Sequence, residues 1–294
     1  MFGSNTQSKR SFILSQQPPQ PQVQGEAGLN FDHIKRSIAV ASGKGGVGKS
    51  TCSVNLSVAL AEMGAKVGLM DGDIYGPNVP MMMGVRAAPE VVEGKLKPVE
   101  KYGVKMISMA FFLEEDQPVV WRGPMIHGAI RQFLADVDWG DLDYLLVDLP
   151  PGTGDAQLSL SQTIPLTGAV VVTTPQGVSL ADAKKAKVMF DKVSVPVLGV
   201  IENMSYFTIP GTGERHEIFS SGGGKKFAEE YGVGFLGDIP LYIGVREGGD
   251  EGNPIVLREP DSEPAQAFKA AAKSLKEICD SLGGDGPKKE TVYF

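Results

Sequence analysis

A glycine-rich stretch that carries two lysines and two hydroxyl side chains is the part of the sequence best suited to chemistry. Residues 41–51 are ASGKGGVGKST. From Gly43 to Ser50 they satisfy the spacing G-x-x-x-x-G-K-S/T, which binds phosphate where a strand precedes the loop and a helix follows it. An apolar run at residues 37–41 and a helical pattern after the loop supply that context. The stretch therefore predicts a phosphate-binding loop for a nucleoside triphosphate.

Each residue type in this loop has a chemical role. The glycines permit backbone conformations and close approach that side chains would forbid, so successive N–H groups can face the phosphates. We expect Lys49 to bridge the β- and γ-phosphates, Ser50 to bind Mg²⁺ and Thr51 to hydrogen-bond the α-phosphate. ATP and Mg²⁺ are the predicted cofactors. The predicted nucleotide contacts within the loop are Gly43, Lys44, Gly45, Gly46, Val47, Gly48, Lys49, Ser50 and Thr51.

Three aspartates after two further apolar runs supply the carboxylates that such an enzyme needs. The segments LMDGD and LLVDLPPGTGD end predicted strands, and ligands gather at the carboxyl ends of strands in open α/β sheets. We expect Asp148 to act on Mg²⁺ through a water molecule, Asp71 to support the same ion, and Asp73 to orient the attacking water. The plainer alternative is that Asp71 or Asp73 only caps a turn. Gly152 and Gly154 form the predicted sensor of the γ-phosphate.

Lys44 is a second lysine in a loop where phosphate binding needs one. ATP carries about four negative charges, and Mg²⁺ with one lysine offsets about three of them, so phosphoryl transfer leaves charge to stabilise. Because Lys44 lies early in the loop, its side chain can point away from its own nucleotide and reach that of a facing subunit, as an arginine finger does. The alternative is a surface lysine without a role.

The apolar runs predict the fold class. Short β-branched runs alternate with helical patterns, and they lack the polar alternation of a half-exposed sheet. This pattern favours an α/β fold with a doubly wound, mostly parallel sheet flanked by helices. The predicted strands lie within residues 37–41, 66–71, 144–150, 169–175 and 195–204.

Two helices are predicted in more detail. The helix after the phosphate loop is expected to stop at Gly64. The last helix is expected to be capped near Ser262, with Pro264 in its first turn. The residues expected on their buried faces are Leu56, Ala59, Leu60 and Met63 for the first, and Phe268, Ala272, Leu275 and Cys279 for the second.

Composition excludes several classes of protein. The net charge of −7 argues against general attraction to nucleic acid, and no run reaches the roughly 18 apolar residues of a membrane span. Only Cys52 and Cys279 are present, which excludes a disulfide scaffold and a cysteine-rich zinc site and fits a cytoplasmic location. A faint transit-peptide character near the start leaves organelle import as an alternative. We expect a flexible arm at residues 1–34, an ATPase domain at 35–283 and a flexible tail at 284–294.

At this point the motifs resemble a known family. KGGVGKST is similar to the deviant Walker A signature of the MinD, ParA and nitrogenase iron protein ATPases. DGDIYGPNVP, VVWRGPM, DYLLVDLPPGTGDAQLSL, PVLGVIENMSYF and IPLYIGVREGGDEG together resemble the Mrp/ApbC family of iron–sulfur cluster carriers, over roughly residues 35–282. The resemblance implies a slow, Mg²⁺-dependent ATPase that works as an ATP sandwich homodimer, with Lys44 reaching across it. It also implies that Asn203 contacts adenine and that the dimer hands on a cluster.

The sequence departs from that family where the cluster would be held. After ENMSYF the family carries x-C-P-x-C-G, and two cysteines from each subunit hold a bridging 4Fe–4S cluster. Here Ile209 and Thr212 occupy the cysteine positions. Because such clusters are held mainly by thiolates, the usual site is absent, and a bound 4Fe–4S cluster is doubtful. Cys52 and Cys279 do not recreate the pair, and His216 is expected to be an exposed loop residue.

Two functions therefore stay open. One is an ATP-dependent carrier or assembly factor for iron–sulfur proteins, which uses ligands from a client protein or from a cysteine-bearing relative in a heterodimer. The other is an ATP-switched binding or positioning protein in the manner of MinD and ParA, which no longer carries a cluster.

Overall fold

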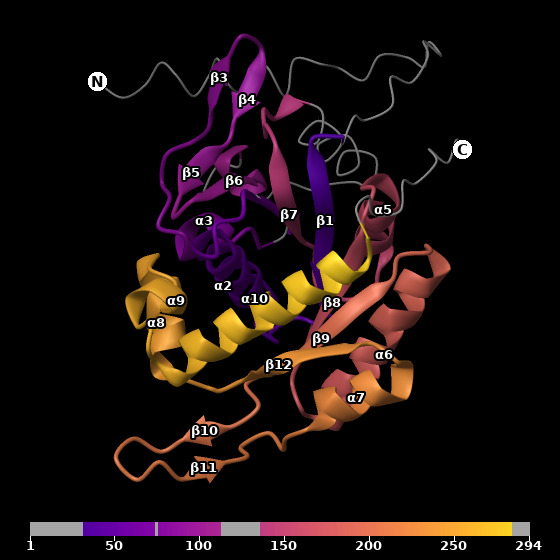
Figure 1. Ribbon diagram of the computed structural model, residues 1–294, viewed down its shortest axis with the longest axis vertical. Coiled ribbons are helices and arrows are strands. Elements are labelled where there is room, and N and C mark those ends of the chain that lie inside the picture. The colour runs from indigo at the N-terminus through magenta and orange to yellow at the C-terminus, as the bar shows by residue number, and fades with distance from the viewer. Residues whose placement is uncertain (1–31, 74–75, 113–135, 284–294) are drawn as a thin grey trace.

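The computed structural model describes residues 32–73, 76–112 and 136–283, and these form a twisted sheet covered by helices (Figure 1). The main sheet has eight strands in the order β12-β9-β8-β1-β7-β2-β6-β5. All neighbouring strands are parallel except β5, which runs antiparallel to β6 at one edge. The α/β prediction with a mostly parallel sheet is confirmed.

The main sheet contains the five predicted strands and three more, β5, β6 and β12. The main sheet consists of β1 (Ile34–Ala41), β2 (Val67–Asp71), β5 (Val99–Lys101), β6 (Val104–Ser108), β7 (Leu142–Asp148), β8 (Gly168–Thr173), β9 (Val197–Asn203) and β12 (Gly234–Ile239). Two hairpins stand apart from it, β3 (Glu90–Val92) with β4 (Lys95–Lys97), and β10 (Phe207–Thr208) with β11 (Arg215–His216). Each of the five predicted strands is present, and no end differs from its predicted position by more than three residues.

The helices connect these strands and cover the sheet. They are α2 (Lys49–Glu62), α3 (Val79–Met82), α5 (Asp155–Thr163), α6 (Gly177–Lys192), α7 (Gly223–Tyr231), α8 (Ile243–Glu251), α9 (Ile255–Arg258) and α10 (Glu263–Ser281), with a 3₁₀ turn at Met109–Phe112. Beyond the described residues lie most of the predicted arm, the predicted tail and the VVWRGPM motif. Within the described residues, no helix is both long and apolar enough to cross a membrane.

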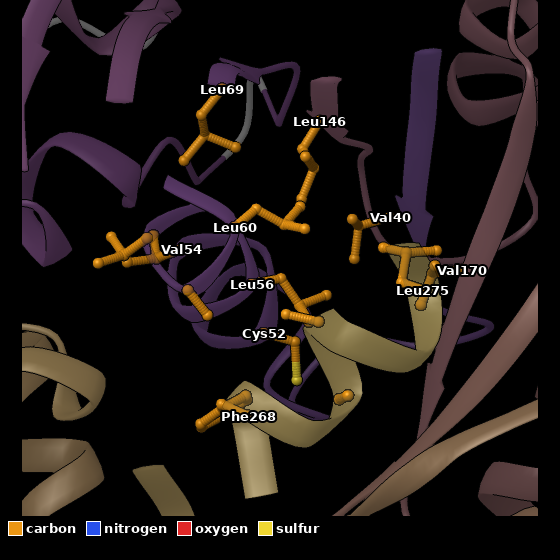
Figure 2. Packing of buried hydrophobic residues seen from close by; sticks show 14 of the residues in the cluster. Val40, Cys52, Val54, Leu56, Leu60, Leu69, Leu146, Val170, Phe268 and Leu275 are labelled. Carbon is orange, nitrogen blue, oxygen red and sulfur yellow. The ribbon is translucent and has the colours of Figure 1, made fainter. Parts of the chain in front are cut away.

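Alternating side chains of the strands build two cores, one on each face of the sheet. In β1, Ile38 and Val40 pack with α2 and α10, whereas Ala39 and Ala41 pack on the other face with residues of α5, α6 and α7. Figure 2 shows Leu56 of α2 between Val40 of the sheet and α10. Burial on both faces explains why the strand sequences are continuously apolar.

The two helices predicted in detail differ in how well they match. In α10, Ser262 Oγ accepts a hydrogen bond from the Ala265 N–H at 3.4 Å, and the predicted core residues are fully buried. In α2, Gly64 adopts a φ of 86° just beyond the helix, as expected of its stop. Met63 is an error of the prediction, because its side chain is 41% exposed. It lies after the last helical residue, where the helical period no longer places side chains on the core.

Candidate functional site

The glycine-rich loop lies between the carboxyl end of β1 and the first turn of α2, in the conformation that its glycines were expected to allow. Gly46 and Gly48 both have a φ of 81°, in the left-handed region that disfavours other residues. At Gly43 a Cβ atom would lie 2.1 Å from the Asp182 carbonyl oxygen of α6. The loop is therefore strained for any other residue at Gly46 or Gly48 and sterically tight at Gly43.

Lys49 begins α2 and points at the carboxylates predicted to accompany it. Its Nζ atom donates a hydrogen bond of 2.7 Å to Asp148 Oδ2 and lies 3.8 Å from Asp73 Oδ2. The lysine is only 6% exposed and Asp148 is fully buried, so each charge depends on the other for compensation. The structure thus brings the predicted phosphate lysine and two predicted carboxylates to one point.

Asp148 accepts hydrogen bonds on both carboxylate oxygens. Ser50 Oγ donates to Oδ2 at 2.6 Å, beside the Lys49 ammonium group. Ser53 Oγ donates to Oδ1 at 2.6 Å. Sequence reasoning predicted Ser50 from the motif and missed Ser53. The available signal was its place four residues after Lys49, on the same face of a helix whose neighbouring residues are apolar.

Asp71 lies beside Asp148 because β2 and β7 are parallel neighbours with these two residues in register. Its Oδ2 atom accepts from Ser108 Oγ at 2.9 Å and from the Val79 N–H at 3.4 Å, and its Oδ1 accepts from the Asp73 N–H at 3.1 Å. Burial, and next the charge of Asp148, raise the pKa of Asp71 well above its ordinary value. Asp71 therefore organises the turn after β2 and also adjoins the predicted metal site.

The oxygen atoms gathered here fit a magnesium ion. Mg²⁺ prefers hard oxygen ligands and binds through one or two carboxylates together with water and substrate phosphates. Ser50 and Asp148 are already in mutual hydrogen-bond contact, and the Asp71 carboxylate stands on the adjacent strand. These three residues would hold the ion, and the chemistry that it supplies is the neutralisation of phosphate charge.

Asn203 ends β9 and contacts the loop itself. Its Nδ2 atom donates a hydrogen bond of 2.8 Å to the Val47 carbonyl oxygen, and the side chain is 5% exposed. A Cβ atom added at Gly48 would come within 2.2 Å of the same Nδ2 atom. Asn203 therefore fixes the loop from the side opposite Asp148. Its expected contact with adenine stays a prediction.

The residue before it, Glu202, has a structural role that the sequence did not indicate. Its fully buried carboxylate accepts hydrogen bonds from Ser205 Oγ at 2.5 Å and from the N–H groups of Gly222 at 2.9 Å and Gly224 at 2.5 Å. It thus anchors the first turn of α7 to β9, next to the residue that holds the loop.

Lys44 is half-buried, and its side chain forms no ion pair within the described part of the chain. The loop around it is tied down by Ser42, whose Oγ donates to the Lys44 carbonyl oxygen at 2.8 Å. The Ser42 carbonyl oxygen in turn accepts from the Gly152 N–H at 3.0 Å, and Gly152 has a φ of 93°. The predicted γ-phosphate sensor is therefore joined directly to the start of the phosphate loop.

The substituted cysteine positions lie in the loop of the β10–β11 hairpin, which Figure 1 shows extending away from the sheet beyond β12. Ile209 and Thr212 supply no thiolate there, and His216 is exposed, with its Nε2 atom 3.4 Å from Glu214 Oε1. The two cysteines are fully buried, as expected for Cys279, and burial raises the pKa of both thiols. The described residues contain no group of three or more histidine, cysteine or acidic side chains suited to a metal. They do not fit a 4Fe–4S cluster.

Comparison with known proteins places this geometry in a family. The ParA family model, described as NUBPL iron-transfer P-loop NTPase, matches residues 33–276, which is most of the chain. The chain belongs to this family. An iron–sulfur cluster carrier protein from Synechocystis is 56% identical over 248 residues, which cover 82% of this chain and 70% of that protein. The predicted resemblance to iron–sulfur cluster carriers is confirmed.

Solved structures agree with this family placement. A nucleotide-binding protein from Archaeoglobus fulgidus in complex with ADP is 40% identical, with a TM-score of 0.71 over 81% of this chain and 93% of that one. The septum site-determining protein MinD of Pyrococcus horikoshii, complexed with Mg-ADP, is 26% identical, with a TM-score of 0.63 over 84% and 98%. The family is one of P-loop NTPases, and the neighbour from Archaeoglobus fulgidus was solved with ADP bound.

Proposed function

We propose that the chain is a slow Mg²⁺-dependent ATP hydrolase that carries or assembles iron–sulfur clusters as an ATP sandwich homodimer. One observation carries the nucleotide part of this proposal. Lys49, Ser50 and Asp148 are in direct hydrogen-bond contact at the carboxyl end of β7, beneath a loop whose glycines leave its backbone open to phosphate. Membership of the iron-transfer family supports the part of the proposal that concerns iron–sulfur clusters.

Each residue of the site has a distinct part in hydrolysis. Lys49 exchanges its bond with Asp148 for the β- and γ-phosphates, and the loop N–H groups orient them. Asp73, 8% exposed and near Lys49, accepts a hydrogen bond from the attacking water and aligns it. Lys44 of the facing subunit offsets the charge that develops on the transferred phosphoryl group. Asn203 holds the loop in place and borders the base.

The cluster is treated as cargo, and its ligands come from outside this chain. The hairpin holds no thiol, and the two cysteines of the chain are fully buried. A client protein or a cysteine-bearing relative in a heterodimer therefore supplies the thiolates, and the nucleotide state of the present chain controls the encounter.

A transfer assay tests this function. The reactants are a glutathione-ligated cluster donor, apo-ferredoxin as acceptor, and the chain with Mg-ATP, and the measured quantity is the rate at which holo-ferredoxin forms. We expect wild-type protein to accelerate transfer only with hydrolysable ATP, and Lys49→Ala to remove the acceleration. ATP turnover without any acceleration would contradict the carrier function.

The alternative function is an ATP-switched binding or positioning protein, and the thiol-free hairpin favours it. In that case ATP drives dimerisation and partner attachment, and cluster transfer is unchanged. Restoring the two thiols by Ile209→Cys with Thr212→Cys provides the matched comparison. Under the carrier function the double variant retains about four irons per dimer after anaerobic reconstitution and still transfers them, as cluster sites of this kind are thiolate-bound. Under the alternative it binds iron without ATP-dependent delivery.

A further inference from the structure

The Asp148 carboxylate is held entirely from α2 in the described structure. Lys49 and Ser50 share its Oδ2 atom, and Ser53 alone donates to Oδ1, at 2.6 Å. All three donors belong to the first turns of one helix, and the acceptor is the last residue of β7. A bound nucleotide would draw away the donors to Oδ2 but not the donor to Oδ1.

Lys49 and Ser50 have other partners when Mg-ATP is bound in the loop. The phosphate-loop lysine turns to the β- and γ-phosphates, and the serine hydroxyl becomes a ligand of Mg²⁺. Ser53 lies one turn beyond the phosphate-binding motif and donates to Oδ1, not to the Oδ2 atom that Lys49 and Ser50 share, so neither the phosphates nor the ion calls on its hydroxyl. It is then the one donor of the three that still fixes the carboxylate.

The Ser53 hydroxyl has a choice of acceptors, and the geometry favours Asp148. A hydroxyl group carries one proton, and Ser53 Oγ lies 3.1 Å from the Lys49 carbonyl oxygen as well as 2.6 Å from Asp148 Oδ1. A bond to a carboxylate is shorter and stronger than one to a backbone carbonyl. The Ser53 hydroxyl therefore donates its proton to Asp148. The Lys49 carbonyl oxygen is the acceptor that a serine inside a helix uses when no better one is available.

We propose that Ser53 is a positioning residue for magnesium, which holds Oδ1 of Asp148 so that Oδ2 stays directed at Ser50 and the ion after Lys49 has turned to the nucleotide. Without it, a fully buried carboxylate would lose its fixed orientation at the moment the metal needs it. This inference rests on the proposed nucleotide site. It assigns Ser53 no contact with ATP.

The test compares Ser53→Ala with Ser57→Ala. Ser57 is also fully buried, lies one turn further along α2, and donates to the Ser53 carbonyl oxygen at 2.7 Å. Both variants lose a buried hydroxyl and a bond within the helix, but only Ser53→Ala loses the bond to Asp148. ADP binding is measured calorimetrically with chelator and with saturating Mg²⁺, and ATP turnover is measured against Mg²⁺ concentration.

We expect Ser53→Ala to bind ADP in chelator like wild type, to lose about tenfold of the gain in affinity that Mg²⁺ gives, and to need about tenfold more Mg²⁺ for half-maximal turnover. Ser57→Ala should stay within about twofold of wild type, and Ser53→Thr, which keeps the hydroxyl, should recover most of the loss. Equal effects of Ser53→Ala and Ser57→Ala would overturn the inference. So would a Ser53→Thr variant that folds yet shows no recovery.

The same data separate this inference from the proposed function. If wild type binds Mg-ADP and hydrolyses ATP while Ser53→Ala matches it, Ser53 has no positioning role and the function stands. If wild type itself shows no Mg²⁺-dependent ADP binding, the proposed nucleotide site is wrong and the role of Ser53 falls with it. Where Ser53→Ala does not fold, Ser53→Cys replaces the hydroxyl with a somewhat larger thiol that is a weaker donor, and it is expected to show the same loss.

Discussion

At the scale of residues, the buried pair of Lys49 and Asp148 dominates the site. Their charged atoms lie 2.7 Å apart, with side-chain exposures of 6% and 0%. Removal of one partner from such a pair leaves a buried charge without its counter-ion. The pair therefore links the stability of the nucleotide-free chain to the same atoms that bind phosphate.

We expect Lys49→Met to lower the free energy of unfolding by about 3 kcal/mol, at the low end for a broken buried ion pair, because Asp148 keeps two hydroxyl donors. Adding Asp148→Asn should return at least half of that loss. Urea denaturation at neutral pH measures both, through the transition midpoint at constant slope. A double variant no more stable than Lys49→Met would show that the two charges are not coupled.

Motif spacing predicted the charged residues of this site, but it did not predict the groups that orient them. Lys49, Ser50 and Asp148 stand at positions that phosphate chemistry dictates, and the structure joins them. Ser53 and Ser108 are ordinary polar residues in sequence, and only the packing of α2 on β7 and the pairing of β6 with β2 turns their hydroxyls to the carboxylates. These hydrogen bonds to the aspartates depend on how the strands and helices align with one another, and that alignment cannot be read from a single sequence.

At the scale of elements, Asp143 connects the amino-terminal ends of β1, β2 and β7. These ends lie on the side of the sheet opposite the predicted nucleotide site. Asp143 lies in β7 and accepts from Lys35 Nζ of β1 at 2.7 Å and from the Lys66 N–H before β2 at 2.8 Å. The Lys35 hydrogen bond first, and then the Lys66 hydrogen bond, lower the pKa of the Asp143 carboxyl group. A carboxyl group with a depressed folded-state pKa stabilises the fold above its unfolded pKa of about 3.9.

The stabilisation from Asp143 should be fully present near neutral pH and disappear as the pH falls below about 4, through the lowered folded-state pKa. We expect Asp143→Asn to cost about 0.5–1 kcal/mol at pH 7, and the difference from wild type to shrink on acidification. Thermal unfolding across this pH range measures it. Asp141→Asn, which removes an equal charge two residues earlier, is the control and should show a smaller difference. A gap that widens in acid would contradict the assignment.

Glu263 clamps the β10–β11 hairpin to the first turn of α10. It accepts from Tyr206 Oη at 3.0 Å, from Thr208 Oγ1 at 2.9 Å and from Arg215 Nη2 at 2.5 Å. The Arg215 guanidinium group also lies 4.1 Å from the centre of the Tyr206 ring. The hairpin is thus tied to a helix that begins 48 residues further along the chain than Arg215. Sequence patterns do not reveal such a contact, and the segment was expected only as a loop.

We expect Glu263→Gln to loosen the hairpin, because the charge-assisted bond to Arg215 is lost while the fold of the sheet is kept. Limited trypsin digestion should cleave after Arg215 about three- to tenfold faster than in wild type. Glu259→Gln is the matched control, because Glu259 is partly exposed, lies four residues before Glu263 and accepts a hydrogen bond from Tyr242 instead. Unchanged cleavage after Arg215 would show that Glu263 does not restrain the hairpin.

At the scale of the whole molecule, β2 and β7 are parallel neighbours, so the predicted carboxylates all lie at the carboxyl ends of these strands. β1 is flanked by β7 and β8, and the chain builds the sheet outward from it in both directions. Continuous apolar runs were enough to predict this class of fold. The antiparallel edge strand β5 and the β3–β4 hairpin were not predicted, because their three-residue strands carry little periodicity.

Lys44 is half-buried, and it is the residue that we propose to act on the nucleotide of a facing subunit. We expect Lys44→Ala to keep wild-type affinity for ATP while ATP turnover falls by at least about 100-fold, because a cation acting on the transition state is removed. Wild-type activity per mole should rise with protein concentration, and sedimentation should show a dimer with ATP. Full turnover by a concentration-independent Lys44→Ala monomer would rule out action in trans.

The burial of both cysteines makes the folded exterior of the chain free of thiols, because Cys52 and Cys279 are its only ones and each has 0% of its surface exposed. A maleimide dye will therefore leave the native protein unlabelled, and a single cysteine engineered at an exposed position becomes a unique attachment point without deletion of native residues. Single cysteines placed on the β10–β11 hairpin or on α6 then allow the proposed dimerisation to be tested by energy transfer between labelled chains with and without ATP. Labelling of the two native cysteines in the same sample then measures unfolding, since only unfolding exposes their thiols to the dye.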